Sequence, residues 1–260
     1  MQAKLPPLLV LLLTGLLSAC GKLDSPEPGE YRAYVKVGGG EIPFMLQVSE
    51  SSDGARLGVE REGELRPLTV VRMQNGALQA ELPDNGGTLV ADIGHRALKG
   101  ELRLTDPHGK PQVLPFAADL HETYRFVAHP GTDNADISGY WELEAISPEH
   151  FSAPVTMQLN QRFDGVDGEL ILPSGKHLAL LGQVSNNDVY LSGLGYGRAL
   201  LLKGKVGKHG ELLGDLWTNL SKAQRWAAKR LPEEDAAAQA QPEEQEQMRY
   251  VAFPSAVPIQ

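Results

Sequence analysis

The chain has 260 residues, of which 24 are basic and 33 acidic, and its net charge at pH 7 is −9. An acidic protein is not attracted to nucleic acid or to anionic lipid headgroups, so neither class of partner is expected. The 28 glycines and 18 prolines indicate many turns, and the length suits two domains of about 100 residues each or one large β domain.

The first 20 residues, MQAKLPPLLVLLLTGLLSAC, have the three zones of a secretory signal peptide. Lys4 is the only charge, residues 8–17 are mostly apolar, and Ser18 and Ala19 are small residues at the expected cleavage site. The apolar stretch is shorter than the roughly 20 residues that span a bilayer. We therefore expect residues 1–19 to be a signal peptide and not a permanent transmembrane anchor.

The residues Leu17, Ser18, Ala19 and Cys20 resemble the lipobox of bacterial lipoproteins. The resemblance implies cleavage before Cys20 and attachment of acyl chains, palmitate among them, to that residue. Several acyl chains hold a protein at a membrane far more durably than one. In the same family, Gly21 after the cysteine implies the outer membrane, with the protein facing the periplasm. The alternative is an ordinary signal peptide with a chance cysteine.

Lipidation of Cys20 leaves the mature chain without a thiol, because this is the only cysteine. A chain of that kind has no disulfide, no thiolate nucleophile and no Cys-rich zinc site. We therefore expect its stability to come from a hydrophobic core.

Short alternating segments begin after a polar, proline-containing stretch at 20–28, which is typical of a tether. From residue 29 to 120, apolar and polar residues alternate between turn sequences, with no helical period. We predict a first β module of about eight strands here. Pro67, in the fourth predicted strand, indicates a sheet edge or a bulge.

The β pattern restarts after a predicted linker at 121–137 and continues over 138–230. The segment SGYWELEA echoes PGEYRAYV, and Gly139 follows Gly29 by 110 residues. That offset indicates a domain-sized duplication, so we predict two similar β modules in tandem. Residues 231–260 form a tail rich in Pro, Glu, Ala and Gln, with a short apolar end.

The predicted fold class is all-β, with two tandem antiparallel up-and-down β-barrels of lipocalin-like type. Sequential hairpins with one apolar face favour closure, because a flat sheet would leave that face and two edges exposed. Glycines inside the predicted strands fit sharp bends at barrel corners; they are Gly58, Gly100, Gly168, Gly182, Gly204 and Gly214. A two-sheet sandwich fits the same pattern and remains the alternative.

Known catalytic and metal-binding motifs are not found in the sequence. None of the seven histidines belongs to a His-x-His or His-Glu-x-x-His pair, and no Gly-x-Ser-x-Gly element occurs. GLGYG at 193–197 indicates a tight hairpin and not a phosphate loop. FDGVDGE at 163–169, with Asp164 and Asp167, indicates a turn and not a calcium loop. We expect no metal, no cofactor and no enzymatic activity.

Aromatic residues of the second module provide the candidate ligand contacts. Trp217 and Trp226 are predicted on neighbouring strands, where they form either core or the wall of a ligand site. The candidate ligand-binding residues are Tyr140, Trp141, Trp217, Arg225 and Trp226. Tyr140 or Arg225 would supply the polar contact. The other inward positions are almost all apolar, and a set of convergent polar groups is not evident.

Several segments resemble one known family: GEYRAYV with GGGEIPFMLQV, LKGELRL with GKPQVLPFAA, DISGYWEL, LLGDLWTNLSKAQRWAAKR and YVAFP. They are similar to the two β modules that precede the thioredoxin domain in some periplasmic disulfide reductases of the TlpA family. The resemblance covers residues 29–254. The thioredoxin domain and its Cys-x-x-Cys are absent, so no redox residue carries over, and the resemblance implies an accessory module.

The main functional hypothesis is a non-enzymatic, lipid-anchored envelope protein. Its β modules would bind an envelope protein or act as a scaffold, accessory to a thiol–disulfide or envelope-assembly system, while acyl chains hold it at the membrane. One alternative is a lipocalin-like carrier of a small apolar ligand, which requires an open interior of at least about 300 Å³. The other is a hydrolase whose site is built from scattered residues.

Overall fold

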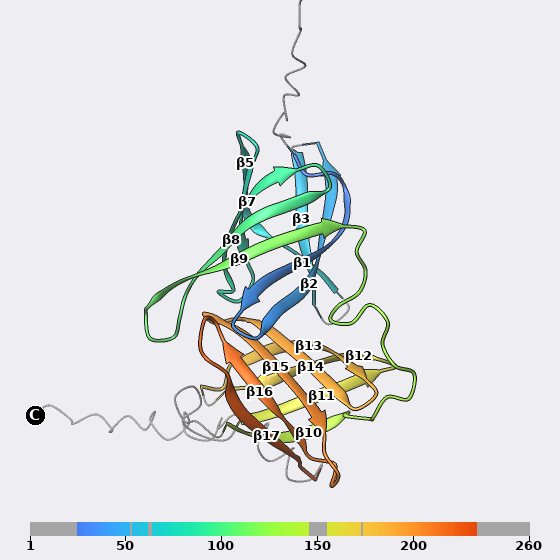
Figure 1. Ribbon diagram of the computed structural model, residues 1–260. Coiled ribbons are helices and arrows are strands. Elements are labelled where there is room, and N and C mark those ends of the chain that lie inside the picture. The colour runs from blue at the N-terminus through green and yellow to red at the C-terminus, as the bar shows by residue number, and fades with distance from the viewer. Residues whose placement is uncertain (1–24, 53, 62–63, 146–154, 173, 233–260) are drawn as a thin grey trace, which may run out of the picture.

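The computed structural model describes residues 25–52, 54–61, 64–145, 155–172 and 174–232. Its regular structure consists of β-strands, and no helix occurs in these ranges; accordingly, they contain no helix able to cross a membrane. The strands form one curled sheet and one closed barrel (Figure 1), which confirms the predicted all-β class. Cys20 and most of the tail lie outside the described residues.

The first module is a nine-stranded antiparallel sheet in the order β4-β3-β2-β1-β9-β8-β7-β6-β5. Its strands alternate buried and exposed side chains, as expected for a sheet with one face on a core. The strands are β1 (Gly29–Val37), β2 (Gly40–Ser51), β3 (Gly54–Arg61), β4 (Glu64–Pro67), β5 (Thr69–Gln74), β6 (Ala77–Leu82), β7 (Gly87–Gly94), β8 (Ala97–Thr105) and β9 (Pro111–Leu120).

A seam in this sheet lies within the segment that the sequence predicts as one fourth strand. The structure divides that segment at Leu68, whose amide donates to Leu57 O at 2.8 Å. The part before Leu68 pairs with β3 and the part after it pairs with β6. Pro67 therefore lies on an edge strand, as predicted, where its missing N–H costs no ladder hydrogen bond.

The second module is a closed antiparallel barrel of strands β10 to β17 in sequence order. The strands are β10 (Gly139–Ala145), β11 (Val155–Arg162), β12 (Gly165–Ile171), β13 (His177–Ser185), β14 (Asp188–Gly195), β15 (Arg198–Val206), β16 (Leu212–Thr218) and β17 (Gln224–Arg230). Pairing of β10 with β17 closes it. The barrel prediction is confirmed here, in preference to the sandwich.

Inward side chains occupy the interior of each module. The second barrel holds a cluster of buried residues that includes Trp141, Met157 and Trp226. Glycine is required where strands of the barrels bend over their neighbours: a Cβ on Gly100 would lie 2.0 Å from Val90 O, and one on Gly168 would lie 2.0 Å from Gln158 O. The predicted role of these glycines as barrel bends fits those close approaches.

The outer wall of the second barrel closes one end of the first module (Figure 1). Ala199 and Leu201 point away from their own barrel and belong to the buried cluster of the first sheet. Trp217 packs on the turn between β1 and β2, where a Cβ on Gly39 would lie 2.2 Å from its ring. Lys203 Nζ donates to Gly39 O at 2.8 Å. One apolar core therefore continues across the junction.

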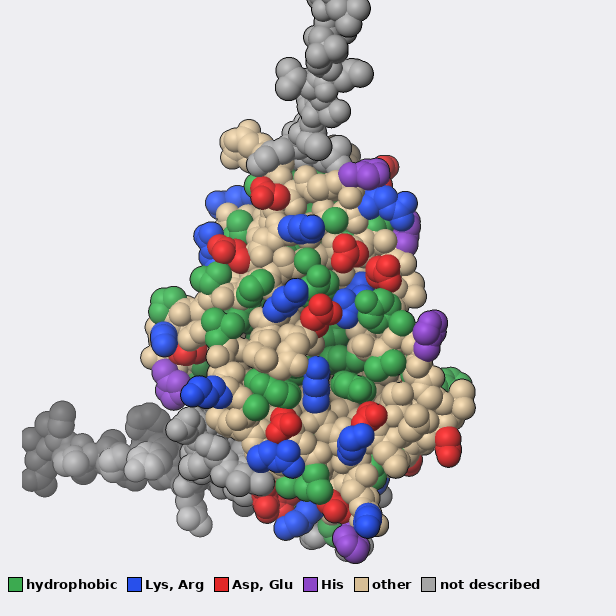
Figure 2. Space-filling model, viewed as in Figure 1, with side chains coloured by type: hydrophobic (Ala, Val, Ile, Leu, Met, Phe, Trp, Pro, Cys, Tyr) green, Lys and Arg blue, Asp and Glu red, His purple; other side chains and the backbone are tan. Residues whose placement is uncertain are grey.

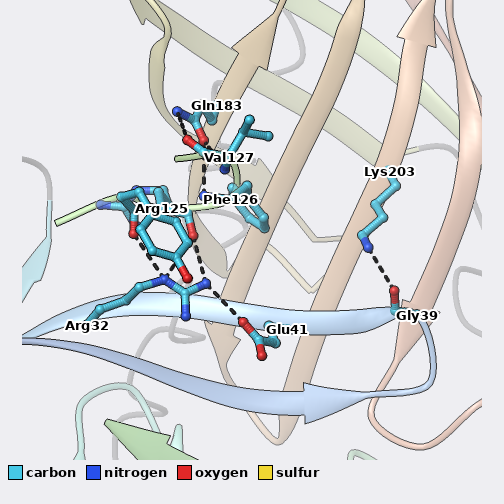
Figure 3. A network of polar contacts seen from close by, with 9 residues as sticks. Arg32, Gly39, Glu41, Arg125, Phe126, Val127, Gln183 and Lys203 are labelled. Carbon is cyan, nitrogen blue, oxygen red and sulfur yellow. Dashed lines mark hydrogen bonds and ion pairs between the residues drawn. The ribbon is translucent and has the colours of Figure 1, made fainter. Parts of the chain in front are cut away.

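The linker between the modules is bonded to both of them (Figure 3). Arg32, only 5% exposed on β1, donates through Nε to Tyr124 O at 3.0 Å and through Nη2 to Arg125 O at 3.0 Å. Its Nη2 also contacts Glu41 at 2.9 Å, and its guanidinium lies 4.3 Å from the Tyr124 ring centre. The first module thus binds the start of the linker through the guanidinium of Arg32, which is itself paired with Glu41.

The second barrel holds the next residues of the linker. Gln183 Oε1 accepts from the amides of Phe126 and Val127 at 3.0 and 2.8 Å, and the Phe126 ring stacks on Tyr190 at 5.5 Å. Burial lowers the pKa of Arg125, while the Glu60 charge acts in the opposite direction. The segment predicted as a linker is therefore a strap that fixes one module on the other.

Candidate functional site

The five candidate ligand residues do not converge on one place. Trp141 and Trp226 are each 1% exposed inside the second barrel, and Trp141 Nε1 donates to Ile137 O at 2.9 Å. Trp217 lies on the opposite face of the wall, against the first module. Tyr140 is half-buried on the outer face, and Arg225, with its side chain 65% exposed, pairs with Asp215 at 3.3 Å.

The two tryptophans predicted on neighbouring strands are on neighbouring strands but on different faces. Trp226 pairs with Gly214 on the inward face of β16, whereas Trp217 alternates to the outside. A shared ligand wall requires both rings on one face. Their role as ligand contacts stays a prediction.

Turns predicted from the sequence are present in the second barrel. Tyr196 and Gly197, both with positive φ, form the hairpin between β14 and β15, so GLGYG is a tight hairpin as predicted. Asp164 lies in the turn between β11 and β12 and accepts from Gln183 Nε2 at 2.9 Å. In the described ranges, no three His, Cys, Asp or Glu side chains are placed to hold a metal ion.

A cleft of about 1100 Å³ lies where the modules meet, outside the interiors of the curled sheet and of the closed barrel. The β8–β9 hairpin projects from the first sheet beside the junction and forms one wall (Figure 1). The β14–β15 hairpin forms the other wall, and its Tyr196 and Gly197 amides donate to Asp84 O and Asn85 O at 2.7 and 3.2 Å. These backbone bonds between the modules fix the width of the cleft.

A second hollow of about 260 Å³ continues this cleft over one end of the second barrel. The two share Asp106, Pro107, Gln112 and Arg198. The smaller one, which we call the barrel mouth, is completed by the turn after β16, including Thr218, Leu220 and Ser221. Elsewhere on the face shown in Figure 2, charges of both signs are interspersed.

Asp106 shapes the hairpin wall of the barrel mouth. Its carboxylate accepts from the amides of Lys110 and His108 at 2.9 and 3.0 Å and from Gln112 Nε2 at 3.2 Å. The hydrogen bond from the Lys110 amide is the largest cause that lowers the pKa of Asp106, and those from His108 and Gln112 act in the same direction. The carboxylate is therefore engaged in its own turn.

Asn219 shapes the opposite wall. Its side-chain oxygen accepts from the Ala199 amide at 2.7 Å and its Nδ2 donates to Gly197 O at 3.2 Å. Asn219 is 6% exposed, so its side-chain amide is both engaged and buried. Both walls of the mouth are thus set by internal hydrogen bonds.

Arg198 is a candidate functional residue that the sequence analysis does not identify. Its half-buried side chain makes no hydrogen bond or ion pair with any residue that the structure describes, and burial lowers its pKa. A guanidinium stays charged in proteins, so the barrel mouth holds a partly desolvated, unpaired cation. A signal exists in RALLL, where Arg198 occupies the inward position that precedes Leu200 and Leu202.

Comparison with known proteins does not assign this chain to a family. No protein-family model matches the chain, and no curated protein matches it. The resemblances to lipoproteins and to the TlpA family therefore rest on sequence pattern alone.

Proposed function

We propose that this chain is a lipid-anchored protein of the bacterial envelope that binds a partner protein without catalysing a reaction. Its sequence pattern supports acyl chains on Cys20 and an outer-membrane position facing the periplasm. We further propose that it serves as an accessory module in a thiol–disulfide or envelope-assembly system. That part follows from the resemblance to the TlpA family.

The binding role rests on the position of the cleft. The cleft lies outside the interiors of the two modules, between two walls that backbone hydrogen bonds hold at a fixed spacing. Buried side chains occupy the barrel interiors, which favours recognition at the outer surface over enclosure of a ligand. A cleft at a domain junction is a preferred place for ligands, and rigid walls reduce the entropy lost on binding.

Photo-crosslinking in the producing bacterium tests this proposal. A benzoylphenylalanine at Val113, which is 48% exposed and lines the cleft, is expected to yield a crosslinked product of one defined mass. The same probe at Arg56, exposed on β3 near the far end of the first module, is the control and should yield none.

The anchor is tested with the same strains. Replacement Cys20→Ser should move the protein from the membrane to the soluble periplasmic fraction and abolish palmitate labelling. Equal crosslinking at Val113 and Arg56 would contradict the binding role, and unchanged fractionation of Cys20→Ser would contradict the anchor.

A further inference from the structure

We infer that the barrel mouth binds the C-terminal carboxylate of an apolar peptide segment, with Arg198 as its counter-ion and Thr218 as a hydrogen-bond donor. This inference rests on the proposed binding function and names the chemistry that the cleft recognises. It concerns residues that no sequence motif marks.

Arg198 and Thr218 lie at one end of the second barrel on adjacent strands. Thr218 pairs with Leu200 in the β15–β16 register, and Arg198 is two residues before Leu200 on the same inward face. Both residues line the barrel mouth. A guanidinium and a hydroxyl therefore share one hollow, and Leu200, the inward residue that follows Arg198 and pairs with Thr218, belongs to the buried core of the barrel.

One polar atom of the barrel mouth is buried without a partner in the described structure. Thr218 is 7% exposed, and its Oγ1 has no hydrogen-bond partner in the described structure. Gln224 Oε1 and Trp226 Nε1 on β17 are also buried without partners in the described structure, but neither residue lines the barrel mouth. Buried polar groups are almost always hydrogen-bonded, so the unpartnered hydroxyl of Thr218 points to a group that is bound in use.

The charges around the mouth select an anion. The cations Arg198 and Lys110 line it, and its one lining carboxylate, Asp106, already accepts three hydrogen bonds within its own hairpin. The flat guanidinium matches the two oxygens of a carboxylate, and the pair is stronger where water is partly excluded. In a chain of net charge −9, this is a local positive site.

The lining of the larger cleft favours a peptide over a simple anion or an alkyl chain. Exposed apolar side chains stand beside the route from the mouth: Leu220 is 57% exposed and Val113 is 48% exposed. Polar side chains also line the cleft, including Asn85, Thr88 and Gln112. The side chains of a peptide can pack on the apolar residues of the cleft, and its backbone amides can bond to the polar ones. An alkyl chain would leave those polar side chains without hydrogen-bond partners.

Binding of defined peptides to the full-length lipidated protein in detergent tests the inference. The probe is a fluorescent hexapeptide of alanine, valine and leucine with a free C-terminal carboxylate, compared with the same peptide as a C-terminal amide. Anisotropy titration should show that the acid binds at least about tenfold more tightly than the amide, since a charged hydrogen bond is lost in the amide.

Three variants locate the preference. Arg198→Gln should weaken binding of the acid about tenfold or more and remove the difference between acid and amide. Thr218→Val keeps the shape of the side chain and should weaken the acid a few-fold. Arg162→Gln, a matched change at an exposed arginine of β11 in the same barrel, should leave both affinities unchanged. Circular dichroism and the midpoint of thermal unfolding establish that each variant is folded.

Equal affinity of acid and amide for the wild-type protein would overturn the inference without using any variant. A preference for the acid that survives in Arg198→Gln, or dodecanoate binding in place of the peptide, would overturn it as well. If one of these outcomes were found while the crosslink at Val113 was still observed, the carboxylate site would be refuted and the proposed binding of a partner protein would stand. Absence of the crosslink at Val113 would instead contradict the proposed binding of a partner protein, on which this inference rests.

Discussion

Gly39 lies where the two modules touch, and its missing side chain makes room for Trp217. A Cβ there would lie 2.2 Å from the indole ring, although the φ of this residue is not in the left-handed region. The requirement for glycine is therefore one of space between modules and not of backbone conformation. The turn GGG can be read as a turn from sequence, but the ring that presses on it comes from a strand 178 positions later.

We predict that Gly39→Ala lowers the free energy of unfolding by about 1–3 kcal/mol, because an added methyl overfills the junction. Gly165→Ala is the control: its Cβ would meet only Arg162 O at 3.5 Å, and the change should stay within about 0.5 kcal/mol. Urea denaturation measures both. Adding Trp217→Ala to Gly39→Ala should make the glycine change nearly neutral, and strictly additive effects would contradict the contact.

The linker is the element whose structure differs most from its composition. Residues 121–137 look like a solvated connection, yet Arg32 and Gln183 bond its backbone at successive residues. Gln183 is 5% exposed. One amide side chain thus satisfies two backbone donors and, through Nε2, also contacts Asp164 at 2.9 Å.

Gln183→Leu should cost about 2 kcal/mol or more, because the amides of Phe126 and Val127 lose their acceptor in a buried setting. Gln161→Leu removes the acceptor of only one backbone amide, that of Ile137, which donates to Gln161 Oε1 at 2.9 Å. It also removes the exposed bond from Gln161 Nε2 to Phe163 O at 3.0 Å, and it should cost less. Limited proteolysis of the linker and urea denaturation report the two effects. If the two variants lowered the free energy of unfolding equally, the two hydrogen bonds that Gln183 Oε1 accepts would contribute no more than the single one at Gln161.

At this scale the sequence predicts strands well and contacts between elements poorly. The alternation of apolar and polar side chains locates the strands of both modules, because each segment's own sequence indicates which of its faces is buried. It predicts one strand where β4 and β5 are divided, because the change of partner at Leu68 depends on β3 and β6. Arg32, Gln183 and Arg198 look like ordinary polar residues of strands. Only the approach of a distant segment, or the closure of the barrel, gives them a role.

At the scale of the whole molecule, the apolar core of the first module extends onto the outer wall of the second barrel. Ala199 and Leu201 of the second barrel lie among the buried side chains of the first sheet, with Trp217 and Leu194 packed beside them. Separation of the modules would expose this surface to water at a cost of about 25 cal/mol per Å² of apolar area. We therefore expect the two modules to unfold together and to keep the cleft between fixed walls.

Adjacent residues on β15 allow this expectation to be tested with a matched pair. Leu200 and Leu201 are both 0% exposed, but Leu200 belongs to the cluster inside the second barrel and Leu201 to the cluster of the first sheet. Each change to alanine should cost about 2–5 kcal/mol, by loss of buried methyl groups and the cavity left behind. The location of the effect should differ between them.

Hydrogen exchange followed by mass spectrometry should separate the two variants. Leu201→Ala should speed exchange most in β1 and β2, although the substituted residue is in the other module, because it removes part of the surface that closes the first sheet. Leu200→Ala should act first on β10, β16 and β17. If Leu201→Ala left the first sheet as protected as in the wild type, the shared core would carry no coupling, and the cleft would lie between independent bodies.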